Sequence, residues 1–218
     1  MGQTAIYGVS TVLSRLFGFI LTPIYTRAYG SATYGILTKL FAYSSLINAV
    51  LAFGMESTYF RYLNKHEDKK QEVYNNSFLC IAGMSILFLV SGMVFRNSIA
   101  AYLTADARQL EDYKIYVNCF LWILFVVAIC VIPFARLRAE NRPVKYSIIK
   151  FSNIGAFVGL NLFFIKVIPF IVALNWPLAE WVSTWYRSGW VGYVFISNLI
   201  ASLVTLLLLL PEFLKLQL

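Results

Sequence analysis

The sequence has 218 residues, of which 60% are hydrophobic and only 13% are charged. Soluble domains carry about 25% charged residues, so this composition excludes a soluble protein and predicts an integral membrane protein. The formal net charge of +8 does not indicate a nucleic-acid-binding protein, because the basic residues lie mostly at the ends of apolar runs and not in one patch. We interpret them as topology signals.

The sequence offers little for metal or redox chemistry. The three cysteines lie inside apolar runs without metal-site or disulfide spacing, and His66 is the only histidine. There is no paired acidic metal motif, no histidine cluster and no nucleophile elbow. We therefore expect no metal, no cofactor and no enzymatic activity. The N-terminus lacks the basic region of a cleavable signal peptide, so the first helix is expected to persist.

The first expected span, residues 4–28, contains an arginine well inside an apolar run. At helical spacing, Thr11, Arg15, Gly18 and Thr22 fall on one small, polar face. An arginine at the centre of a lipid-exposed helix costs about 2.5–3.5 kcal/mol on insertion scales, so it should face protein or a wet cavity. A cavity with a fixed positive charge indicates an anionic substrate. The alternative is a structural arginine that pairs with a carboxylate or with helix-end carbonyls.

Five further apolar runs have the length of about twenty residues that crosses hydrocarbon. They cover residues 36–62, 77–95, 115–135, 144–167 and 190–210. The expected fold is therefore all-α, a single membrane domain over residues 1–218 with six transmembrane helices. Basic residues are denser in the even-numbered connections, which places both termini in the cytoplasm.

Other expected spans also carry polar side chains at helical spacing. The candidates for a shared substrate cavity with Arg15 are Asn48, Glu56, Asn153 and Asn198. Glu56 could pair with Arg15 or another buried cation, or reach the membrane interface. Pro23 lies inside the first span, where it predicts a hinge or a packing irregularity.

The connections between spans have distinct compositions. Residues 29–35 are expected to form a glycine-rich turn, and residues 63–74 a solvated charged loop. The most basic segment, residues 136–145, is interpreted as a topogenic loop, with phosphate binding as the alternative. Residues 168–189 predict an aromatic helix along the outer interface, with Pro177 in its first turn and Trp181 and Trp185 four residues apart. Pro211 is expected to end the last span.

Several short motifs carry a resemblance to a known family. They are Ser14-Arg15, Gly18-Phe19, Pro23, Thr26-Arg27, Tyr34-Gly35, Gly54, Glu56, Arg61 and the segment 136–141. With them the chain resembles the polysaccharide biosynthesis flippases of the O-antigen type, within the multidrug/oligosaccharidyl-lipid/polysaccharide exporter superfamily. The resemblance implies a bacterial inner-membrane protein that exports oligosaccharide linked to undecaprenyl diphosphate by alternating access. It also implies an anion-binding central cavity around Arg15, with the lipid-linked oligosaccharide and membrane lipids as partners.

The resemblance also implies a larger protein than this sequence. Such transporters have about twelve to fourteen spans in two similar lobes, whereas six are expected here. We therefore expect the chain to represent a fragment or an N-terminal lobe, and a half-transporter that pairs with a partner chain is the alternative. A cation-coupled multidrug antiporter of the same superfamily would need an acidic cavity, for which Glu56 is the candidate. A non-transporting membrane scaffold would use the polar faces for helix packing.

Overall fold

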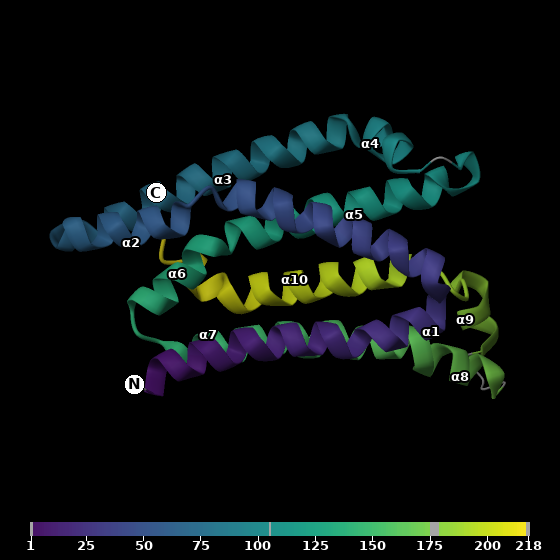
Figure 1. The fold of residues 1–218 in the computed structure, drawn as a ribbon. Helices are drawn as coiled ribbons and strands as arrows, with labels where there is room; N and C mark the ends of the chain where they lie inside the picture. The colour runs from purple at the N-terminus through teal and green to yellow at the C-terminus, as the bar shows by residue number, and fades with distance from the viewer. Residues whose placement is uncertain (1, 105, 175–178, 217–218) are drawn as a thin grey trace.

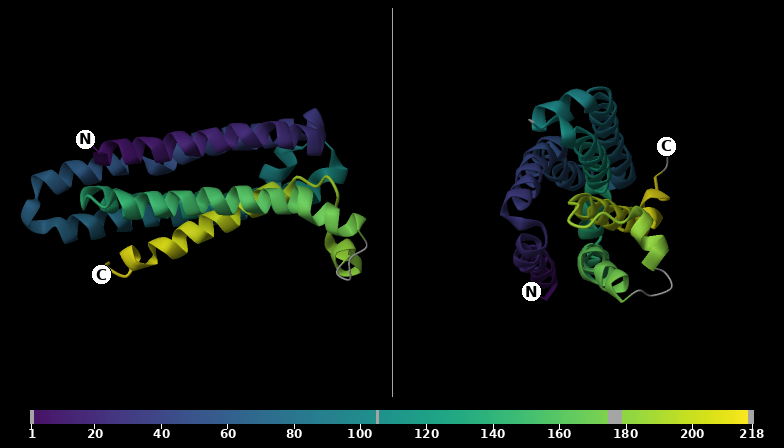
Figure 2. Two further views of the ribbon diagram at one scale, coloured as in Figure 1. Left: turned by 90° about the horizontal axis from the view of Figure 1, so that it is seen from below. Right: turned by 90° about the vertical axis from the view of Figure 1, so that its right-hand side faces the viewer.

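The computed structural model describes residues 2–104, 106–174 and 179–216, with the backbone alone for residues 2–11, 13–15, 17–19, 31 and 32. These residues form helices and short connections, without a β-strand. Figure 2 shows that the long helices lie side by side in one elongated bundle, with both termini towards the same end. The chain is therefore an all-α integral membrane protein, as its composition predicted.

The first two expected spans are joined by a sharp kink. Helix α1 (Gly2–Ala52) is broken at Gly30, which has φ 76° and ψ 164°. A positive φ of this size strains residues that carry a Cβ atom, so glycine permits the change in direction. The two halves of α1 fold back on each other (Figure 1). The expected turn over residues 29–35 is therefore wrong in length, because one residue reverses the helix.

Helical structure extends further into the charged connections than we expected. After α2 (Met55–Lys65), a single 3-10 turn η1 (Glu67–Lys69) leads directly into α3 (Lys70–Val94). The predicted loop over residues 63–74 is therefore mostly helical, because lysine, glutamate and glutamine are good helix formers in water. Next comes the short helix α4 (Arg96–Leu103), which is followed by the 3-10 turn η2 (Ala107–Gln109).

The second half of the chain contains two interrupted spans and one continuous span. The first consists of α5 (Leu110–Ile129) and α6 (Val131–Ala139). The second begins with α7 (Pro143–Leu162), passes through the π-helical turn η3 (Phe163–Val167) and ends with α8 (Ile168–Ala173). The continuous span is α10 (Gly192–Phe213), which contains Pro211 and ends two residues after it.

Part of the expected interfacial segment is helical. Helix α9 (Ala179–Trp185) carries Trp181, whose side chain is 65% exposed, and Trp185. Pro177 lies outside the described residues. An aromatic helix at membrane-surface depth therefore stays a prediction.

Among the residues that the structure describes, five helical segments are long and apolar enough to cross a membrane. They are Thr33–Lys65, Glu67–Val94, Ala107–Ala139, Pro143–Ala173 and Gly192–Phe213. The first predicted span coincides with the first half of α1, where most side chains lie outside the described set. Pro23 lies within this half, and the irregular backbone dihedrals of α1 occur at Gly30 and not at Pro23.

Helix α5 forms the centre of the bundle. It packs against α1, α3, α4 and α10, and its buried residues include Leu121 and Leu124. At Gly92 of α3, an added Cβ atom would collide with the Leu121 side chain, so glycine permits the close packing there. This packing leaves α1, α7 and α10 around a space that polar side chains line.

A polar, positively charged cavity as the candidate functional site

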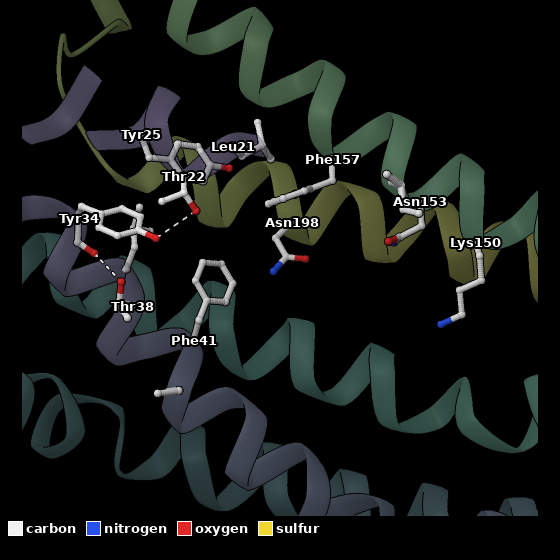
Figure 3. A pocket seen from close by; sticks show the side chains of 13 residues that line it. Leu21, Thr22, Tyr25, Tyr34, Thr38, Phe41, Lys150, Asn153, Phe157 and Asn198 are labelled. Carbon is white, nitrogen blue, oxygen red and sulfur yellow. Dashed lines mark hydrogen bonds between the residues drawn. The ribbon is translucent and has the colours of Figure 1, made fainter. Parts of the chain in front are cut away.

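Helices α1, α7 and α10 enclose a cavity of about 660 Å³. Its lining residues are Leu21, Thr22, Tyr25, Tyr34, Leu37, Thr38, Phe41, Ala42, Lys150, Asn153, Ile154, Phe157 and Asn198. Figure 3 shows Thr22, Tyr34 and Thr38 at one end, Asn198 in the middle and Lys150 at the other end. The Tyr34 hydroxyl donates a hydrogen bond of 3.3 Å to Thr22 Oγ1 and so connects the two halves of α1.

A second cavity of about 350 Å³ adjoins the first. The two share Lys150, Asn153 and Asn198 as lining residues. The second cavity extends to Glu56 of α2 and Arg138 of α6, and it also contacts Asn48. Together the two cavities form one path along α7 and α10, which is largely apolar in the larger cavity and polar in the smaller one, where Glu56 and Arg138 lie.

The described side chains among the predicted site residues come together at this path. Thr22, Asn48, Glu56, Asn153 and Asn198 all line it, from helices α1, α2, α7 and α10. The side chains of Thr11 and Arg15, and the surroundings of Gly18, lie outside the described set. Their role in the cavity stays a prediction. The hinge role of Pro23, which is exposed next to Thr22, is likewise untested.

Asn153 is partly engaged in helix packing. Its Nδ2 group donates hydrogen bonds to the backbone oxygen of Ala201 at 2.8 Å and to Thr205 Oγ1 at 3.0 Å. Both acceptors belong to α10, so these bonds tie α7 to α10. By contrast, Asn48 Oδ1 is buried with no hydrogen-bond partner among the described residues. An acceptor of this kind is available to a ligand that carries hydroxyl or amide donors.

Lys150 is a cavity residue that the sequence analysis did not select. It lies on α7, three residues before Asn153, and lines both cavities. Its ammonium lies 4.5 Å from the centre of the Phe134 ring and 5.9 Å from that of Tyr146. It makes no hydrogen bond or ion pair with the side chains that the structure describes. Its spacing from Asn153 was visible in the sequence, but we had counted its charge as a topology signal.

Arg138 is the second cation that we had not selected. Its Nη2 atom forms an ion pair with Glu56 Oε1, which joins α6 to α2. Its guanidinium also lies 5.6 Å from the Phe60 ring centre and 5.8 Å from that of Tyr146. The structure thus assigns Glu56 a cationic partner on α6, one of the possibilities that the sequence left open. With Lys150 and Arg138 against Glu56, the described part of the cavity has one positive charge in excess.

The basic segment 136–145 also takes part in ion pairs around a buried carboxylate. Glu212 on α10 is fully buried and accepts hydrogen bonds from Lys145 at 2.7 Å and from Lys215 at 2.8 Å. Arg136 donates to Glu140 at 2.7 Å and lies 3.9 Å from Glu212. These pairs join the ends of α6, α7 and α10. They give several residues of this segment a structural role, and its topogenic role stays a prediction.

Neither of these charge clusters has the composition of a metal centre. Among the described residues, no group of three or more histidine, cysteine, aspartate or glutamate side chains is placed to hold a metal ion. The chemistry that the cavity offers is therefore that of fixed cations and amide groups.

Comparison with known proteins gives one family. The family model described as "Polysaccharide biosynthesis protein" matches residues 2–176, which include α1 to α7 and most of the cavity lining. No curated protein and no solved structure matches the chain significantly.

Proposed function

The chain belongs to the polysaccharide biosynthesis protein family, and from this membership and the charged cavity we propose that it transports a lipid-linked oligosaccharide. The substrate in this proposal is an oligosaccharide on undecaprenyl diphosphate, which moves from the cytoplasmic to the outer leaflet. The observation that carries the proposal is the presence of Lys150 and Arg138 in a polar cavity between membrane-crossing helices.

The charges of the cavity suit a diphosphate. Ionisable side chains within membrane spans are costly and mark substrate pathways by default. A guanidinium such as that of Arg138 binds phosphate oxygens in a two-pronged fork, whereas the Lys150 ammonium acts as a compact charge. The amides of Asn48 and Asn198 line the same path and offer hydrogen bonds to sugar hydroxyls. Arg15 would add a third cation from α1.

The proposed function also implies a membrane, an orientation and a partner for this protein. We place the protein in the bacterial inner membrane with both termini in the cytoplasm, because the clustered basic ends of α6, α7 and α10 are typical of the cytoplasmic side. Alternating access needs a second lobe, so this lobe would act with a further lobe or with a partner chain. In this proposal the protein moves its substrate without chemical change and is not an enzyme.

Two other functions have some structural support. A cation-coupled drug antiporter would use the carboxylate of Glu56, but that carboxylate is paired with Arg138. A non-transporting scaffold would use polar faces for packing, as Asn153 does against Thr205. Neither function explains why Lys150 lines the cavity without an ion pair to any described carboxylate, so we favour anion transport.

The test is to replace Lys150 in the protein as its host cell makes it. Lys150→Met keeps most of the side-chain volume and removes the charge, and it should reduce glycan export at least tenfold. Lys150→Arg should retain a substantial part of it. Lys114→Met is the matched control, because Lys114 lies outside both cavities and pairs with Glu111, whose side chain is 81% exposed, so the pair contributes little. Surface glycan, accumulated lipid-linked precursor and membrane insertion would be measured together. Normal export by Lys150→Met would contradict the proposal.

A further inference from the structure

The proposed anion site contains a carboxylate, which would by itself repel an entering anion. Glu56 lines the same 350 Å³ cavity as Lys150 and Arg138. Its Oε1 atom is paired with Arg138 Nη2, so it occupies one prong of the guanidinium fork that could bind phosphate. A resident carboxylate therefore already fills part of the anion-binding position.

The exposure of this pair differs from that of a structural ion pair. The side chains of Arg138 and Glu56 are 30% and 40% exposed. At the nearby Glu212 cluster the carboxylate is 0% exposed and is held by two lysines. Separating a buried pair is strongly destabilising, whereas partly exposed groups regain solvent or a new partner. The Glu56–Arg138 pair can therefore open at a much lower free energy than the Glu212 cluster.

The guanidinium is better fixed than the carboxylate. Arg138 lies near the rings of Phe60 and Tyr146, and its Nε atom is buried with no hydrogen-bond partner among the described residues. The Nε–H group would become available to a ligand only if the side chains around it shifted. Glu56 lies in the first turn of α2 and is the more exposed partner. An exchange of partners would move the carboxylate and leave the guanidinium in place.

We propose that Glu56 is a resident counter-anion that holds Arg138 until the phosphate groups of the substrate displace it. This inference rests on the proposed function and adds a control on affinity at the same site. A cavity with two unopposed cations would retain a diphosphate strongly, and transport requires binding that is weak enough for release. Glu56 lowers the affinity because an entering anion must first replace it. It also favours anions with two phosphate groups, which can reach both Arg138 and Lys150, over those with one.

The test measures binding of inorganic pyrophosphate to the purified protein in detergent by titration calorimetry. Glu56→Gln removes the competing charge and should bind pyrophosphate about tenfold more tightly, within the usual range of pairwise coupling. Glu56→Asp keeps the charge on a shorter side chain and should give an intermediate affinity, which protects the test if Glu56→Gln folds poorly. Glu56→Gln combined with Arg138→Gln should bind no more tightly than Arg138→Gln alone. Glu111→Gln, at an exposed pair, should match the wild type.

The outcomes separate this inference from the proposed function. Tighter binding by Glu56→Gln that depends on Arg138 would support the counter-anion role. If the wild type binds pyrophosphate through Lys150 but Glu56→Gln binds equally or less well, the counter-anion role is overturned and the anion cavity stands. If pyrophosphate binds to none of the variants, or binds equally to Lys150→Met, both are overturned.

Discussion

Asn153 on α7 and Thr205 on α10 are joined by a hydrogen bond of 3.0 Å between Nδ2 and Oγ1. The same amide reaches the backbone oxygen of Ala201 at 2.8 Å. A residue of the proposed substrate path is thus also a contact between two spans. Its packing role and its transport role can be separated by changing the two partners one at a time.

Thr205→Val should lower stability only slightly and leave glycan export near normal. It removes the side-chain acceptor and keeps the shape, and such interhelical bonds in membranes contribute on average about 0.6 kcal/mol. Asn153→Leu should lower both stability and export, because it removes two donated hydrogen bonds and a polar group that lines both cavities, whereas Thr205 lines only the smaller cavity. Thermal unfolding in detergent and export in cells would be compared for both variants. An equal loss of export in Thr205→Val and Asn153→Leu would indicate that Asn153 and Thr205 serve helix packing alone.

Glu212→Gln should destabilise the protein by about 1–3 kcal/mol, because a fully buried carboxylate loses its charge while its partners remain. Lys145 and Lys215 are 36% and 37% exposed and regain water, so the loss stays below that of a fully buried pair.

The matched control for this variant is Glu72→Gln. Glu72 pairs with Lys69 at 3.3 Å and is 66% exposed, so its replacement should leave the unfolding temperature unchanged. Unfolding would be followed by circular dichroism in one detergent. Equal midpoints for the two variants would contradict a structural role for Glu212.

Gly30→Ala should destabilise the hairpin of α1 by about 1–3 kcal/mol, because φ at this position is 76° and a Cβ atom there is strained. Gly35→Ala is the control. Gly35 lies in regular helix with open space around it, so alanine should be neutral or stabilising there. Unfolding temperatures of the two variants should therefore move in opposite directions, and a Gly30→Ala variant as stable as the wild type would place the reversal elsewhere.

The sequence predicted the polar faces well because helical periodicity is local. The positions of Thr22 and Asn198 follow from the spacing of 3.6 residues per turn and needed no tertiary information. The kink at Gly30 was harder to predict, since any glycine in a helix can adopt regular or left-handed dihedrals. We had assigned the break to residues 29–35 as a turn and the hinge to Pro23.

The two missed cations show where local reasoning fails. Lys150 lies six residues inside the predicted span 144–167, and Arg138 lies three residues beyond the predicted span 115–135, in the segment that we interpreted as a topogenic loop. At such positions long basic side chains can reach the headgroups or turn inwards equally well. Only the packing of α6 and α7 decides between these directions. The choice of Arg138 as the partner of Glu56 likewise depends on contacts between segments about 80 residues apart in the sequence.

The role of Arg15 in substrate binding stays a prediction from the sequence, and mutation can test it. Thr22, seven residues later on the helical stripe that the sequence predicts for Arg15, lines the cavity. Arg15→Lys should lose much of the export, because an ammonium cannot bind phosphate in a fork, and Arg15→Ala should lose nearly all of it. Arg27→Ala, at an exposed position of the same helix, is the control and should export normally.

A double variant tests the alternative that Arg15 has a structural role as the ion-pair partner of Glu56. If Arg15 served only to balance Glu56, then Arg15→Ala together with Glu56→Gln should restore export, since both charges would be absent. Because Glu56 already has Arg138 as its partner, we expect the double variant to remain defective. Glycan export and membrane insertion would be measured for the single and double variants. Near-normal export by the double variant would show that Arg15 does not bind the substrate.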